Sequence, residues 1–156
     1  MTSSKKIFGE RLAQRRRELG LSQRKLATLI GIRGPAVAAY ETDDAWPSAS
    51  TLIALAKALD VSTDYLLGLS DQIHYNMGMS HRSTTSPDEW IQEFSERLRS
   101  ARRRQQLSQA ALARQLGIDQ STMVQYESGR TRPSLAVARR LAATLDVSLD
   151  WLCGLA

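Results

Sequence analysis

Hydrophobic residues recur at helical spacing along this chain, and glycine and proline divide the helical stretches into short pieces. In the second half, Phe94, Leu98 and Ala101 fall on one side of an ideal helix, and Leu112 and Leu116 mark the next one. Continuous alternation of apolar and polar residues, which is typical of strands, is missing. The pattern therefore predicts an all-α protein.

Capping residues predict where these helices begin and end. Ser86-Pro87-Asp88-Glu89 has a serine cap, a proline at the first helical position and a glutamate at the third, which favours a helix running toward Gln106. Four more helices are expected after it, at about 108–117, 119–129, 134–145 and from Ser148 onward. Five short helices thus make up the second half.

The first half repeats this plan at a constant shift of 86 positions, from Ser22 to Ser108 and from Pro47 to Pro133. Residues 8–69 and 94–155 align without a gap, with roughly two-fifths of positions identical. We expect two five-helix domains, at 1–69 and 86–156.

The polar composition of residues 70–85 is typical of a linker, and we expect it to join the two domains. Fully extended, such a segment reaches roughly 50 Å, which exceeds the roughly 34–36 Å between half-sites one turn of DNA apart. One chain is therefore long enough to span two half-sites.

Charge favours a polyanionic partner. The chain has 21 lysines and arginines against 16 acidic residues, a formal charge of +5 and a pI near 9.8. Its 42% hydrophobic and 24% charged residues are typical of a folded globular protein.

Several other classes of protein are disfavoured. No apolar run approaches the roughly 18 residues of a membrane helix, and the N-terminus has no signal core, so we expect a cytoplasmic protein. We expect the thiol of the single cysteine, Cys153, to be buried in the hydrophobic core. His74 and His81 lie in the linker without metal-ligand spacing, and no catalytic motif is recognisable, so we expect no enzyme, no metal and no cofactor.

Both halves carry the same punctuated motif. In the second half it reads Leu107-Ser108-Gln109, Leu112-Ala113, Gly117-Ile118, Tyr126-Glu127, Pro133-Ser134 and Leu145-Asp146-Val147-Ser148. In the first half it reads Leu21-Ser22-Gln23, Leu26-Ala27, Gly31-Ile32, Tyr40-Glu41, Pro47-Ser48 and Leu59-Asp60-Val61-Ser62. This motif resembles the lambda-repressor and Cro-like (XRE) helix-turn-helix family over about four-fifths of the chain. The resemblance implies two lambda-repressor-like domains in tandem.

The third helix of the second repeat is then expected to read DNA bases. At 100° per residue, Met123 and Tyr126 point to the core, whereas Gln120, Ser121 and Gln125 share the opposite side. A glutamine amide can bond adenine N6 and N7 together, and a hydroxyl can serve either kind of base edge. These three residues are the predicted base readers.

The resemblance also assigns contacts to the DNA backbone and within the fold. It implies that Gln109 meets a phosphate and braces Gln120, and that Thr122 and the two loop arginines Arg130 and Arg132 bind phosphates. It further implies structural ion pairs between Arg103 and Glu127 and, in the first repeat, between Arg17 and Glu41.

The first repeat departs from this pattern on the same face. Gly34, Pro35 and Ala39 replace the three polar readers, and the loop after its third helix carries two aspartates where the second repeat has two arginines. Those acids would repel phosphate. Gln23 and Arg33 remain as candidates for secondary DNA contacts.

Two explanations stay open for this altered face. Either it binds a weakly specified half-site, or it has lost base reading and, together with Trp46, packs against another surface. Ordinary core packing of Trp46 is the alternative for that residue.

Taken together, the sequence predicts a sequence-specific regulator of transcription that binds double-stranded DNA, a repressor associated with the nucleoid. One small DNA-binding module seldom suffices, which favours a homodimer on a palindrome, joined through the first repeat or through the fifth helix. The competing hypothesis is an antitoxin-like or protein-interaction helix-turn-helix protein whose N-terminal repeat binds a protein partner.

Overall fold

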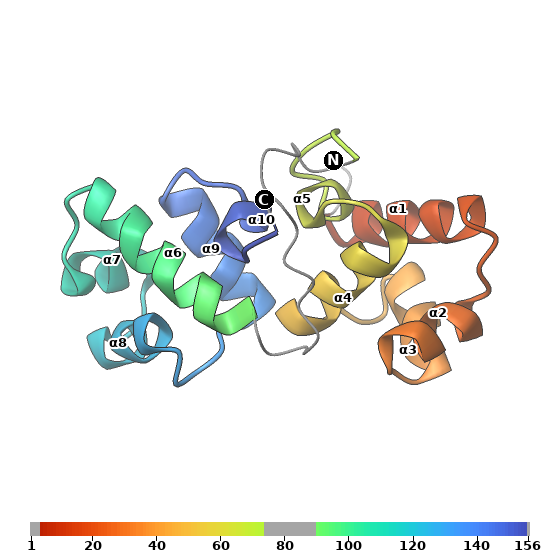
Figure 1. Cartoon of the computed structure of the whole chain (residues 1–156), viewed down its shortest axis with the longest axis horizontal. Coiled ribbons are helices and arrows are strands. Elements are labelled where there is room, and N and C mark those ends of the chain that lie inside the picture. The colour runs from red at the N-terminus through yellow and green to blue at the C-terminus, as the bar shows by residue number, and fades with distance from the viewer. Residues whose placement is uncertain (1–3, 74–89, 156) are drawn as a thin grey trace. The chain divides into compact units, whose positions relative to one another are not determined.

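The computed structural model describes residues 4–73 and 90–155, and every regular element within them is an α-helix (Figure 1). The chain divides into two compact units, Met1–Asn76 (unit 1) and Met77–Ala156 (unit 2). The prediction of an all-α fold built from two five-helix repeats is confirmed.

Each unit contains five helices among its described residues. In unit 1 they are α1 (Ser4–Glu18), α2 (Gln23–Ile30), α3 (Gly34–Glu41), α4 (Ala49–Leu59) and α5 (Thr63–Leu66). In unit 2 they are α6 (Trp90–Arg104), α7 (Gln109–Leu116), α8 (Gln120–Ser128), α9 (Leu135–Thr144) and α10 (Leu149–Leu152).

Serine side chains begin six of these helices, as the sequence predicts. Each accepts a hydrogen bond from the backbone N–H three residues later, which satisfies one of the free donors of the first helical turn. The six are Ser22, Ser48, Ser62, Ser108, Ser134 and Ser148. The expected start of the helix at Ser86–Glu89 lies outside the described residues.

The hydrophobic faces of the helices form one core in each unit. Phe8, Leu12 and Leu26 are fully buried in unit 1, and Phe94 and Leu98 are fully buried in unit 2. Cys153 is also buried, as expected of a packed thiol. Each unit therefore has its own hydrophobic core, built from equivalent positions of the two repeats.

The first residues of the predicted linker are bonded to unit 1. The Arg11 guanidinium donates to the backbone oxygen of Ser70 at 2.8 Å and to the Asp71 carboxylate at 2.8 Å. Ordered structure therefore continues past residue 69, and the boundaries at 69 and 86 stay predictions.

Asp43 adopts a backbone conformation that suits glycine. Its φ is +72°, and Gly129, at the equivalent position of unit 2, has a φ of +74°. The Asp43 Oδ1 atom is buried and has no hydrogen-bond partner within the described residues. Unit 1 therefore carries both backbone strain and an unsatisfied acceptor at this point.

Replacing Asp43 by glycine is expected to stabilise unit 1 by about 1 kcal/mol, because it relieves both costs. Gly129→Ala should destabilise unit 2 by a similar amount, since a methyl group is introduced at the same positive φ. Chemical denaturation of the full chain would measure both changes. Destabilisation by Asp43→Gly would show that the carboxylate has a favourable role.

Candidate nucleic-acid interface

Helices α7 and α8 of unit 2 form the helix-turn-helix element, and Gly117 makes the turn between them. Gly117 has a φ of +67°, a conformation that costs glycine little, and its N–H bonds back to the last turn of α7. Leu112 and Met123 are buried between these helices and the core. The turn and this packing fix how α8 lies across α7.

The outer side of α8 is exposed, and its inner side is buried. Met123 and Tyr126 are buried, as predicted, whereas Gln120, Ser121 and Gln125 are exposed. The three predicted base readers therefore share an accessible face of one helix. Gln120 is exposed, so its amide is accessible to an external ligand.

Val124 belongs to the same face and was missed by the sequence interpretation. Its side chain is 42% exposed, and it lies four residues after Gln120 and three after Ser121. An aliphatic side chain at such a position can contact the methyl group of thymine. Helical spacing places Val124 on this face, but a prediction based on hydrogen-bonding side chains does not include a valine.

A loop residue orients one of the predicted readers. The Thr131 hydroxyl donates to Oε1 of Gln125 at 2.7 Å. This bond leaves both hydrogens of the Gln125 amide nitrogen available as donors. The contact joins the loop after α8 to the exposed face and could not be read from helical periodicity.

Glu127 anchors the back of α8. Its carboxylate accepts from Nε of Arg102, from Nη2 of Arg102 at 3.1 Å and from Nε2 of Gln109 at 2.7 Å, and its side chain is only 3% exposed. Arg102 also donates to the backbone oxygen of Leu107 at 2.8 Å. We call Arg102, Gln109 and Glu127 the unit 2 brace.

The predicted partner Arg103 is therefore wrong by one residue. Arg102 lies four residues after the fully buried Leu98 and shares its inward side of α6. Arg103 is turned about 100° further and is exposed. The expected brace between Gln109 and Gln120 is also replaced, because the Gln109 amide bonds Glu127.

Unit 1 contains the same arrangement. Glu41 accepts from Nε of Arg16 at 2.5 Å, from Nη2 of Arg16 at 3.1 Å and from Nε2 of Gln23 at 2.8 Å. The hydrogen bond with Glu41 raises the pKa of the Arg16 guanidinium above its usual value. The predicted partner Arg17 is exposed and is wrong for the same reason of helical phase.

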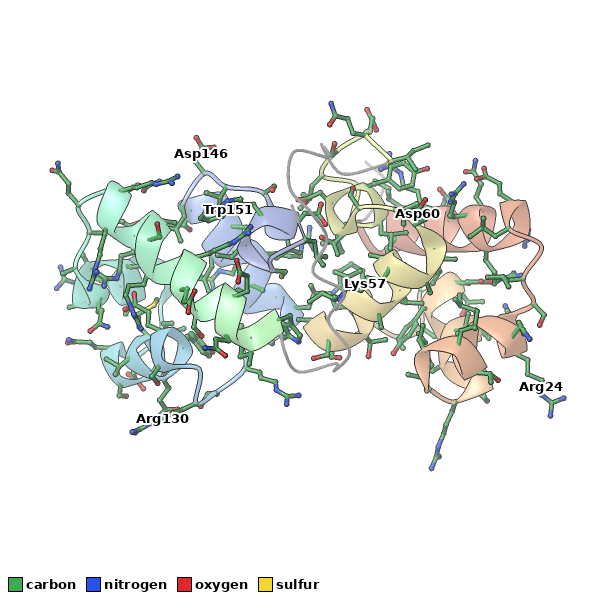
Figure 2. The ribbon with its side chains drawn as sticks, viewed as in Figure 1. Arg24, Lys57, Asp60, Arg130, Asp146 and Trp151 are labelled. Carbon is green, nitrogen blue, oxygen red and sulfur yellow. The ribbon has the colours of Figure 1, made fainter. Side chains whose placement is uncertain are left out.

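The residues predicted to bind phosphate differ in their exposure to solvent. Arg130 is exposed and extends away from the loop after α8, as Figure 2 shows, and Arg132 is exposed on the same loop. Thr122 is half-buried. Gln109 uses one N–H for Glu127, and its amide nitrogen carries a second hydrogen.

The corresponding face of unit 1 is accessible but lacks polar readers. Pro35 is exposed and Gly34 and Ala39 are half-exposed on α3, while Arg33 before the helix and Asp44 after it are exposed. Basic and acidic charge therefore lie at opposite ends of this face.

Trp46 takes part in the core of unit 1. Its ring centroid lies 5.3 Å from that of Phe8, which is fully buried, and Trp46 itself is half-buried. The core interpretation of this residue is favoured over an external contact.

Residues 4–73 and 90–155 contain no helix long and apolar enough to cross a membrane. Over the same residues no group of three histidine, cysteine or acidic side chains is placed to hold a metal ion. His74 and His81 lie outside the described residues.

Comparison with known proteins supports the duplicated motif. A family model described as helix-turn-helix matches residues 12–66 and again residues 98–152. No solved structure matches the chain.

The curated relatives match about two-fifths of the chain. The repressor protein C2 of Salmonella phage P22 is 38% identical over 61 residues, which cover 39% of this chain and 28% of that protein. The uncharacterized HTH-type transcriptional regulator YqaE of Bacillus subtilis strain 168 is 43% identical over 61 residues, or 39% of this chain and 53% of that protein. The cryptic phage CTXphi transcriptional repressor RstR of Vibrio cholerae is 34% identical over 62 residues, or 40% of this chain and 55% of that protein. This chain thus spans about half or less of each relative's length.

Proposed function

Because the chain belongs to the helix-turn-helix family, whose model matches both of its repeats, we propose that it is a sequence-specific regulator of transcription that binds double-stranded DNA. In this proposal α8 of unit 2 enters the major groove and reads base edges. Repression is the proposed sign of regulation, since two relatives are named repressors.

The exposed face of α8 carries the proposal. Gln120, Ser121 and Gln125 offer donors and acceptors to solvent, and Val124 adds an apolar contact for a thymine methyl group. The unit 2 brace fixes the same helix from behind through Glu127. A rigid helix with an exposed polar face is what direct reading in a major groove requires.

Gln120→Ala is expected to weaken binding to the cognate site by about 1–3 kcal/mol and to leave binding to random DNA nearly unchanged, because base contacts carry sequence information. Selection of bound sites from random DNA supplies the cognate site, and fluorescence anisotropy then measures both affinities. Equal losses on cognate and random DNA would refute base reading by Gln120.

Arg130→Ala is expected to make the fall of log affinity with log salt less steep, by about 0.9 in the slope, because one phosphate contact is lost. Affinity for cognate and random DNA should fall together, in contrast to Gln120→Ala, which serves as the control with an unchanged slope. Arg132, Thr122 and Gln109 are the other proposed phosphate ligands. An unchanged slope in Arg130→Ala would remove this arginine from the interface.

The proposed assembly is a homodimer on a palindromic operator. The domains at 1–69 and 86–156, joined by the linker at 70–85, would let each chain present its second unit to one half-site. The protein would act in the cytoplasm at the nucleoid, as a non-enzymatic regulator without a cofactor.

A second candidate function concerns unit 1. The polar readers are replaced on α3, and two aspartates follow it, which favours an interaction module for protein over a base reader. In this alternative the chain is antitoxin-like, and its N-terminal repeat binds a protein partner. Gln23 and Arg33 would supply secondary DNA contacts if unit 1 also touches the backbone. Co-purification and DNA binding by the full chain would separate the two functions.

A further inference from the structure

We propose that the outer face of α3 is a self-association surface, on which α3 of a second copy of this chain packs in antiparallel orientation. The proposal rests on the homodimer suggested above and assigns its interface. The surface consists of Arg33, Pro35, Ala38, Ala39, Thr42 and Asp44, which we call the α3 face.

The middle of the α3 face permits close approach. Pro35, Ala39 and Thr42 follow helical spacing, and the buried Val37 lies on the opposite side of the helix. None of these outer side chains is large. Two helix axes can therefore approach to about 8 Å, the short end of the usual range for packed helices.

The ends of the α3 face are complementary to each other in charge. Arg33 lies five residues before Ala38, and Asp44 lies five residues after Ala39, so the two charges flank the Ala38–Ala39 midpoint symmetrically in the sequence. A two-fold axis at that midpoint brings Arg33 of each copy to Asp44 of the other, because a two-fold interface uses the same patch on both subunits.

Both charged groups are accessible for this pairing. Arg33 is the N-cap of α3, its side chain makes no capping hydrogen bond and it is exposed. Asp44 is also exposed, and its Oδ2 accepts from the Thr42 hydroxyl at 2.6 Å, which holds the carboxylate at the end of the helix. An arginine and a carboxylate so placed can form two ion pairs across the axis.

The same positions in unit 2 show what has changed. Gln125 stands where Ala39 lies, so the middle of that face is bulkier and suited to DNA. A face built on one eight-residue helix and its flanks is small, so we expect weak association in the micromolar range without DNA. A palindromic site then adds the second contact between the two chains.

A charge exchange tests the proposal, with sedimentation equilibrium of the full chain in the absence of DNA. Arg33→Asp and Asp44→Arg should each weaken dimerisation about tenfold or more, because each places like charges opposite one another. The double variant Arg33→Asp/Asp44→Arg should restore it to within about threefold, since opposite charges meet again. Arg17→Asp changes the charge equally on an exposed position of α1 and should have no effect.

Ala39→Gln tests the close approach separately. The fold should accept this change because unit 2 carries Gln125 at the equivalent position, yet dimerisation should weaken about tenfold as the longer side chain separates the helices. A chain that is monomeric at all concentrations, or single charge variants that dimerise normally, would overturn the proposal.

Two further outcomes would also overturn it. Failure of the double variant to recover would show that the two charges do not meet. Loss of DNA affinity in Arg33→Asp with unchanged dimerisation would assign the face to the phosphate backbone. The proposed function is tested independently, because Gln120→Ala changes DNA recognition without altering the oligomeric state.

Discussion

Replacing Glu127 by alanine is expected to destabilise unit 2 by about 3–5 kcal/mol, because the largely buried Arg102 guanidinium would lose its counter-charge. The side chains of Arg102 and Glu127 are only 11% and 3% exposed, so water cannot readily replace the lost partner. Gln109 would lose its acceptor as well. Glu127→Gln keeps the size and one acceptor and should cost less.

Chemical denaturation followed by tryptophan fluorescence would measure the loss, since Trp90 and Trp151 lie in unit 2 and Trp46 lies in unit 1. Only the unit 2 transition should move. Arg103→Ala is the matched control, and this exposed change should alter stability by no more than about 0.5 kcal/mol. If Arg103→Ala cost as much as Glu127→Ala, the assignment of the unit 2 brace would be wrong.

Most of the fold could be predicted because its determinants are local. Serine caps, glycine turns and apolar spacing act within one or two helical turns, so Ser22, Gly31 and their counterparts Ser108 and Gly117 mark element boundaries without knowledge of the tertiary structure. The duplication supports the predicted helix boundaries, since each boundary occurs twice at one constant shift. Residue burial on α8 followed from the same periodicity.

The ion pairs were predicted less well because they depend on helical phase between distant segments. Three consecutive arginines at 102–104 point in three directions about 100° apart, and the resemblance chose the middle one. Anchoring the phase on Leu98 would have selected Arg102. The acidic partner Glu127, which the resemblance also implied, was identified correctly.

Contacts made by loops had no periodic signal to reveal them. Two features depend on how the chain leaves the third helix of each unit. One is the bond from Thr131 to Gln125, and the other is that the Asp43 Oδ1 atom has no partner among the residues that the structure describes. Asp43 occupies the place of Gly129, so the repeat itself hinted at strain there. The burial of the Asp43 Oδ1 atom could be known only from the tertiary structure.

Gly9→Ala is expected to destabilise unit 1 by about 1–3 kcal/mol, because α1 passes too close to the end of α3 for any side chain. A Cβ atom at Gly9 would lie 2.6 Å from the backbone oxygen of Glu41 and 2.9 Å from that of Tyr40. Backbone atoms cannot yield as a flexible side chain can, so the helices would have to separate and disturb Glu41.

Gly34→Ala is the matched control within the same unit. Gly34 is also helical, and a Cβ atom there would meet no atom within 4 Å apart from its chain neighbours. Because Pro35 follows and disfavours the helical conformation for a residue with a Cβ, the change should cost at most about 1 kcal/mol, less than Gly9→Ala. Denaturation of the two variants side by side therefore separates close helix approach from the general effect of replacing glycine. Equal responses would show that α1 and α3 can move apart at little cost, and the tight contact at Gly9 would not be what holds α3 in place.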